Sequence, residues 1–148
     1  MRYFGFLLLF LFLGCKKESV LDENYKYLEG KWRIKSQPFD FFPFDYDETK
    51  CSLDKNAIIE IKDNGEIIFS SKNCSFQKNY QISMDTFLET IYKNKRLSYG
   101  ITKKNNNEIT LFSGDFPTNI IKKRKIDLYE VAMIEKRGFE IELEKIKE

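Results

Sequence analysis

Apolar and polar side chains alternate along most of the chain from residue 31 onward, which is the pattern of β-strands that bury one face. Trp32 and Ile34 share one face of the first such segment. In the last segment, Phe139, Ile141 and Leu143 alternate with glutamates, so we expect one buried face and one acidic, solvated face. The expected strands cover residues 31–35, 56–62, 66–71, 77–83, 97–103, 108–113, 126–135 and 139–146.

The clearest pair of strands is a hairpin whose turn lies at residues 63–65, with the sequence Asp-Asn-Gly. A three-residue loop would place Ile59 opposite Phe69 and would bring opposite charges together beside the turn. A two-residue loop would instead place Ile59 opposite Ser70. We therefore expect the three-residue loop, with Gly65 in the left-handed conformation.

Two segments are less regular. Residues 85–94 fit both a helix, by the spacing of their apolar side chains, and a strand, by their threonine and aromatic content. Leu21, Tyr25 and Leu28 have an i, i+4, i+7 spacing, which predicts a short N-terminal helix that Gly30 would end.

About eight short strands separated by turns predict an all-β fold. Neighbouring hairpins favour a small antiparallel, eight-stranded barrel, because closure removes the exposed edges of a sheet. A two-sheet sandwich is the alternative.

The N-terminus has the layout of an export signal. Arg2 precedes an apolar run at residues 4–13, and Gly14-Cys15 follows. The run is too short for a helix that spans a bilayer core of roughly 30 Å. We expect residues 1–14 to be a signal peptide, 15–24 to be a polar tether and 25–148 to be one domain.

The sequence Phe12-Leu13-Gly14-Cys15 resembles a bacterial lipobox, although that signal usually has Leu or another aliphatic residue where Phe12 stands. The resemblance implies a lipidated Cys15 and a chain anchored to a membrane of the bacterial cell envelope, with the outer membrane as the expected location. An ordinary signal peptide cut nearby, or an uncut anchor, is the alternative. Periplasmic and surface exposure both remain open.

Composition excludes several classes of function. The chain has 25 basic and 23 acidic residues, so its net charge of +2 gives no strong attraction to nucleic acid. It has no histidine, which removes the commonest general base and metal ligand. No phosphate-binding loop, nucleophile motif or metal-spaced cluster is present in the sequence. We therefore expect a protein that is not an enzyme and uses no cofactor or metal.

Once Cys15 is assigned to lipidation, Cys51 and Cys74 remain as an even pair in an exported chain. An oxidising compartment favours a disulfide between them, and two free buried thiols are the alternative.

The segment at residues 28–34 is similar to the Gly-x-Trp start of lipocalin-like domains, such as those of Bacteroidetes lipoproteins. Three further features match that family: the placement of Cys51 and Cys74, Asn-Gly in the turn between them, and an ending of the form aliphatic, Glu, Leu, any residue, Lys, aliphatic at 141–146. The resemblance implies a lipocalin-like barrel with Trp32 plugging its closed end. It implies little about function, because most members of the family have no assigned chemistry.

Residues 38–47 read PFDFFPFDYD, an aromatic cluster on a connection that follows the first strand. Its rings are expected to cap the barrel's own core, to form a lid over an apolar ligand, or to contact a partner or membrane. The candidate ligand-binding residues are Trp32, Phe39, Phe41, Phe42 and Phe44. The basic run at 122–125 is expected to be a solvated surface, with contact to an anionic lipid or polymer as its alternative.

Two functional hypotheses follow. The first is a lipid-anchored lipoprotein whose barrel binds a small apolar ligand. The second is a non-enzymatic interaction or assembly protein whose barrel is filled by its own side chains, since eight strands can either be filled or hold one small ligand. The sequence does not identify a protein partner.

Overall fold

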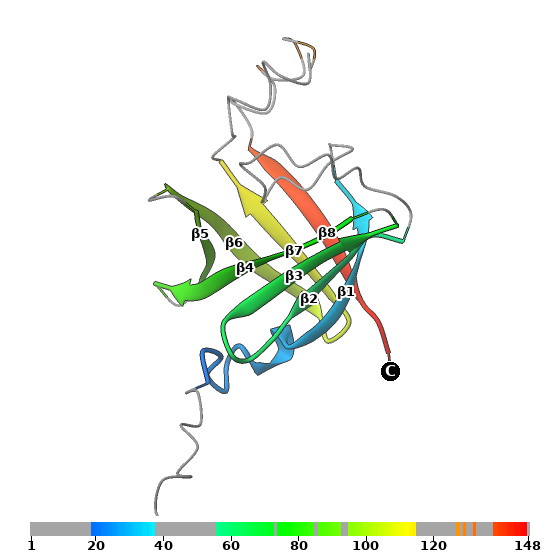
Figure 1. Cartoon of the computed structure of the whole chain (residues 1–148). Coiled ribbons are helices and arrows are strands. Elements are labelled where there is room, and N and C mark those ends of the chain that lie inside the picture. Colours follow the sequence, from blue (N-terminus) through cyan, green and yellow to red (C-terminus); the bar gives the residue numbers. More distant parts are fainter. Residues whose placement is uncertain are drawn as a thin grey trace, which may run out of the picture.

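The computed structural model describes residues 19–37, 56–72, 74–84, 86–92, 95–114, 127, 129, 132 and 138–147. Its elements are a 3-10 turn, η1 (Lys26–Leu28), and the strands β1 (Gly30–Ser36), β2 (Ile58–Ile61), β3 (Glu66–Ser71), β4 (Cys74–Ser83), β5 (Phe87–Tyr92), β6 (Lys95–Asn105), β7 (Glu108–Ser113) and β8 (Phe139–Lys145). These strands pair in sequence order, and β8 pairs with β1, so the sheet is a closed antiparallel barrel (Figure 1). The predicted fold class is confirmed.

The predicted register of the β2–β3 hairpin is also confirmed. Ile59 pairs with Phe69, and the N–H of Lys62 donates to the carbonyl of Glu66 at 2.9 Å. Gly65 has a φ of +81°, the left-handed conformation that the three-residue loop requires.

The segment that fitted both a helix and a strand forms β5. Leu88 and Thr90 are buried, whereas Phe87 and Ile91 are exposed, so these side chains follow the two-residue period of a strand.

The predicted N-terminal helix is wrong in extent, because among residues 19–29 only η1 is helical. The carboxylate of Asp22 accepts hydrogen bonds from the N–H groups of Asn24 and Tyr25, at 2.8 and 3.2 Å. This local turn competes with a longer helix for the same N–H groups. Leu21 and Leu28 are nevertheless buried in the core, as their apolar spacing indicates.

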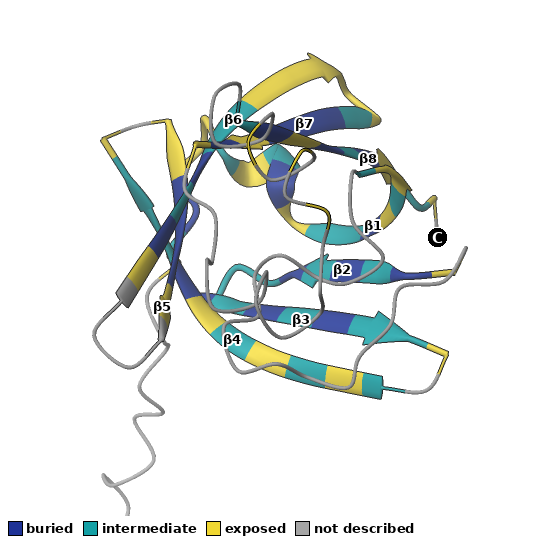
Figure 2. Cartoon of the chain, turned by 90° about the horizontal axis from the view of Figure 1, so that it is seen from above, coloured by how far each residue is buried: buried dark blue, intermediate teal, exposed yellow. Residues whose placement is uncertain are grey.

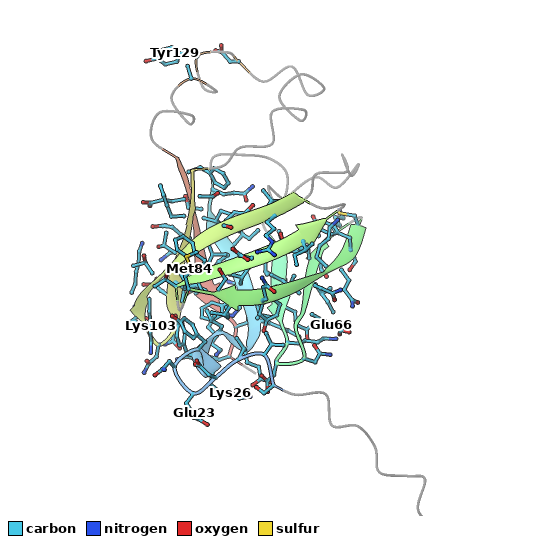
Figure 3. All side chains as sticks on the ribbon, turned by 90° about the vertical axis from the view of Figure 1, so that its left-hand side faces the viewer. Glu23, Lys26, Glu66, Met84, Lys103 and Tyr129 are labelled. Carbon is cyan, nitrogen blue, oxygen red and sulfur yellow. The ribbon has the colours of Figure 1, made fainter. Side chains whose placement is uncertain are left out.

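The strand predicted at 126–135 is contradicted at two positions, since Tyr129 and Ala132 are helical. The Asp127 carboxylate accepts a hydrogen bond from the N–H of Tyr129 at 3.0 Å, the type of contact that starts a helix. Tyr129 is 72% exposed and lies at the end of the molecule opposite Lys26 (Figure 3). The other residues of this segment, except Asp127, lie outside the described ranges.

The barrel has two distinguishable ends. The closed end carries η1 and the turns β2–β3, β4–β5 and β6–β7, and it lies low in Figure 1. The far end carries the last residues of β1, β3 and β7 and the first residues of β4. Inward-facing side chains from all eight strands and the residues before β1 form one core: Leu21, Leu28, Trp32, Ala57, Ile59, Ile61, Ile67, Phe69, Tyr80, Leu88, Leu97, Tyr99, Ile109, Leu111, Phe139, Ile141 and Leu143. Burial of each such aliphatic side chain contributes about 1.5–3 kcal/mol.

Candidate functional site in the barrel

Trp32 lies at the closed end and is fully buried. Its indole N–H donates a hydrogen bond to the carbonyl of Leu28, 2.7 Å away, which ties β1 to the turn that covers this end. Lys145 on β8 lies over the indole, with its Nζ 5.2 Å from the ring centroid. The ring is therefore held by packing, by a hydrogen bond and by a cation–π contact.

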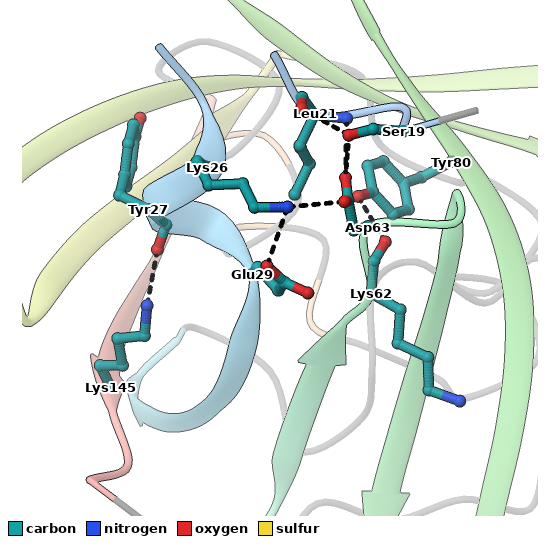
Figure 4. Close-up of polar contacts among 9 residues, drawn as sticks. All are labelled: Ser19, Leu21, Lys26, Tyr27, Glu29, Lys62, Asp63, Tyr80 and Lys145. Atoms are coloured by element: carbon teal, nitrogen blue, oxygen red, sulfur yellow. Dashed lines mark hydrogen bonds and ion pairs between the residues drawn. The ribbon is translucent and has the colours of Figure 1, made fainter. Parts of the chain in front are cut away.

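Lys145 itself is held at the closed end by a second contact. Its ammonium donates to the carbonyl of Tyr27 at 2.8 Å (Figure 4). Burial lowers the pKa of Lys145 from its ordinary value, and the nearby Lys103 lowers it further. Lys103 lies over the ring of Tyr27, 4.6 Å from its centroid.

The N-terminal segment is fixed to the β2–β3 turn through Asp63. The Asp63 carboxylate accepts hydrogen bonds from the Ser19 hydroxyl and from Lys26, the latter at 2.6 Å (Figure 4). The N–H of Val20 donates to the main-chain carbonyl of Asp63 at 2.9 Å. The hydrogen bond from Lys26 holds the pKa of Asp63 below its ordinary value. The chain that precedes the barrel therefore arrives at the closed end.

The interior becomes more accessible along β4. Tyr80 is 5% exposed, but the next inward-facing residues toward the far end, Lys78, Phe76 and Cys74, are only half-buried. Figure 2 shows this strand as alternating exposed and half-buried positions. On β3, the inward residues opposite Lys78 and Phe76, which are Ile67 and Phe69, are fully buried, and Ser71 opposite Cys74 is half-buried. The inner wall of β4 is therefore more accessible to solvent than the part of β3 that pairs with Phe76 and Lys78.

This wall of β4 combines apolar and basic chemistry. The ring of Phe76 stacks on Phe69 of β3, with 4.8 Å between centroids. The Lys78 ammonium lies 5.9 Å from the centroid of the Phe76 ring. Lys78 pairs with the buried Ile67, so its side chain starts from the inner face of the sheet. An apolar molecule with an acidic group would find complementary chemistry at this wall.

A polar cluster lies on the outer face of the barrel at the other end of β4. Glu89 is 8% exposed. Its carboxylate accepts hydrogen bonds from the side chains of Gln81, Ser83 and Ser98 at 2.9, 3.0 and 3.2 Å. Arg96 lies 3.6 Å from it. These contacts, led by Gln81, hold the pKa of Glu89 below its ordinary value, so the carboxylate is ionised at neutral pH.

Of the predicted site residues, the structure describes Trp32 and Cys74. Trp32 lies on β1 at the closed end, and Cys74 begins β4 opposite Ser71. The remaining predicted residues lie outside the described ranges: Cys15, Cys51, Phe39, Phe41, Phe42 and Phe44. The signal peptide at 1–14 and the basic run at 122–125 also lie outside them. These assignments stay predictions.

Sequence reasoning missed two features of this part of the barrel: the inward-facing Lys78 and the polar cluster around Glu89. Lys78 is two residues from the buried Tyr80, so strand alternation could have placed it on the inner face. The cluster around Glu89 brings together residues from three strands, and no local pattern indicates it.

Within the residues that the structure describes, there is no cluster of side chains suited to a metal ion and no helix long and apolar enough to cross a membrane. Comparison with protein-family models, curated proteins and solved structures finds no match to this chain. The antiparallel eight-stranded barrel is compatible with a lipocalin-like fold.

Proposed function

We propose that this chain is a lipid-anchored lipoprotein of the bacterial envelope whose barrel binds a small apolar ligand, preferably one with an acidic group. The observation that carries the ligand proposal is the wall of β4, where Phe76 and Lys78 are half-buried while the inward residues of β3 beside them are buried. An eight-stranded barrel is wide enough either to be filled by its own side chains or to hold one small ligand.

The anchor proposal rests on the lipobox-like leader and is consistent with the path of the chain. Because Ser19 and Val20 are bound to Asp63 at the closed end, an anchor at Cys15 would hold that end toward the membrane. The far end and the β4 wall would then face away from the membrane. A lipid-linked cysteine carrying more than one acyl chain supplies stable anchoring.

The ligand proposal is tested with a fluorescent fatty acid and its methyl ester as probes. Both should bind the wild type, and Lys78→Met should weaken the acid several-fold while leaving the ester unchanged, because an exposed charge pair contributes roughly 1 kcal/mol. Lys72→Met is the matched control, since it removes an equal charge from the exposed β3–β4 turn. Failure of both probes to bind would refute the ligand proposal.

The anchor proposal is tested by metabolic labelling with a fatty-acid analogue. The wild type should be labelled and Cys15→Ser should not. Equal labelling of the two proteins would refute lipidation at Cys15.

A self-filled interaction or assembly protein is the second candidate, and the contiguous core favours it. The inward residues of β2, β3, β7 and β8 are buried along most of each strand. If neither probe binds while the protein remains folded, this candidate replaces the ligand proposal.

A further inference from the structure

The β4–β5 pair is much shorter than β4 itself. Only residues 80–83 of β4 pair with β5, although β4 begins at Cys74 and pairs with β3 from that residue onward. Beyond Tyr80 the two strands diverge toward the far end, as the view along the barrel shows (Figure 2). Within the residues that the structure describes, part of β4 is therefore an edge in an otherwise closed sheet.

The direction of the main-chain groups identifies which residues form this edge. The N–H of Tyr80 donates to the carbonyl of Gly65 at 2.8 Å, so Tyr80 faces the β3 side. In an antiparallel sheet, the N–H and C=O groups of one residue face one neighbouring strand, and those of the next residue face the other. Those of Ser75, Gln77 and Asn79 therefore face the β5 side, where no strand within the described residues pairs with them.

The side chains of this edge lack the usual protection against pairing. Ser75, Gln77 and Asn79 are exposed and uncharged, and the stretch 75–79 has no proline. Natural edge strands are commonly protected by charged residues, especially lysine, or by proline. The one charge within this stretch, Lys78, is on the inner face.

We propose that this edge, residues 75–79 of β4, pairs with the same edge of a second copy of the chain. An antiparallel pair centred on Gln77 is self-complementary, as a two-fold interface must be. Ser75 then lies opposite Asn79 of the second copy, and about six main-chain hydrogen bonds form, each with a net contribution of roughly 0.5–1.5 kcal/mol.

The inward-facing side chains of the two paired edges are also complementary to each other. The register places Phe76 opposite Lys78 of the second copy, so the two lysines do not face each other. Lys78 already lies near the Phe76 ring within one chain, at 5.9 Å, and an equivalent cation–π contact forms between copies. Charge and register thus favour a second copy over an arbitrary peptide.

The test is site-directed disulfide cross-linking of the full chain in mild detergent. Gln77→Cys should cross-link to itself, because Cα atoms of a hydrogen-bonded pair are about 5.5 Å apart, within disulfide range. Ser75→Cys is the matched control: its two copies are offset by four residues, roughly 13 Å, and should not cross-link. The double variant Ser75→Cys/Asn79→Cys should cross-link again, and peptide mapping distinguishes these bonds from native cysteines.

Sedimentation of the wild type provides the second measurement. A dimer should form with rising concentration, and Gln77→Lys should weaken it by placing two ammonium groups at the two-fold axis. Gln77→Lys keeps its N–H and an exposed side chain, so its circular dichroism should equal that of the wild type. A wild type that stays monomeric, or equal cross-linking of the Gln77 and Ser75 variants, would overturn the proposal and leave the edge to an extended segment of another protein.

Discussion

Replacement of Trp32 by phenylalanine should destabilise the barrel by about 2–4 kcal/mol. Truncation of a buried tryptophan to alanine costs about 3–5 kcal/mol, and phenylalanine keeps most of the ring, so the packing loss is about 1–2 kcal/mol. The carbonyl of Leu28 also loses its donor, now at 2.7 Å, which adds roughly 1–2 kcal/mol at a fully buried site.

The measurement is urea unfolding followed by far-ultraviolet circular dichroism. Trp32 is the only tryptophan, so fluorescence cannot follow the variant. Tyr129→Phe is a suitable control because that side chain is 72% exposed, and its effect should stay within about 0.5 kcal/mol. If Trp32→Phe loses no more stability than this control, the plug at the closed end does not hold the fold together as argued.

Three further predictions concern other parts of the barrel. Gly138→Ala should cost about 1–3 kcal/mol, because φ is +72° and the new Cβ would lie 2.5 Å from a ring on β7; Gly114→Ala, with open space around it, should be nearly neutral by the same urea assay. Because the pKa of Glu89 is lowered on folding, its contribution should be present above pH 4.5 and lost as the pH falls through the lowered pKa; Glu89→Gln should therefore be less stable than the wild type at pH 7, by about 1 kcal/mol, and this difference should shrink as the pH is lowered below 4.5. Cys51 and Cys74 should resist alkylation until reduced, and their bridge should contribute roughly 3 kcal/mol; alkylation of both in the folded, unreduced protein would refute the bridge.

The elements that the sequence predicted best are those determined by local chemistry. The turn at residues 63–65 determines the register of its own hairpin, because only one loop length pairs Ile59 with Phe69 and puts the glycine where φ is positive. The segment at 126–135 was assigned wrongly at its two helical positions because its apolar spacing suits more than one period. Asp127, which accepts the N–H of Tyr129, was a helix-start signal that the alternation outweighed.

The divergence of β4 from β5 could not be predicted in the same way, because it depends on contacts between strands. Alternation predicts which face of β4 is buried, but it does not indicate where the neighbouring strand stops pairing. The separation begins beyond Tyr80. The next pair toward the closed end joins Gln81 to Glu89 through a side-chain hydrogen bond, and Ser98 ties Glu89 to β6.

The two proposals for β4 arise from this single divergence and involve different atoms. Even-numbered residues such as Phe76 and Lys78 project their side chains into the barrel, where the loss of the β5 neighbour increases access from solvent. The odd-numbered Gln77 projects its side chain outward and directs its main-chain groups to the side that β5 has left. The hydrogen bonds of Glu89 with Gln81 and Ser83 tie β5 to β4 on the closed-end side of the divergence. The proposed ligand wall and the proposed dimer edge therefore depend on the same short pairing of β4 with β5.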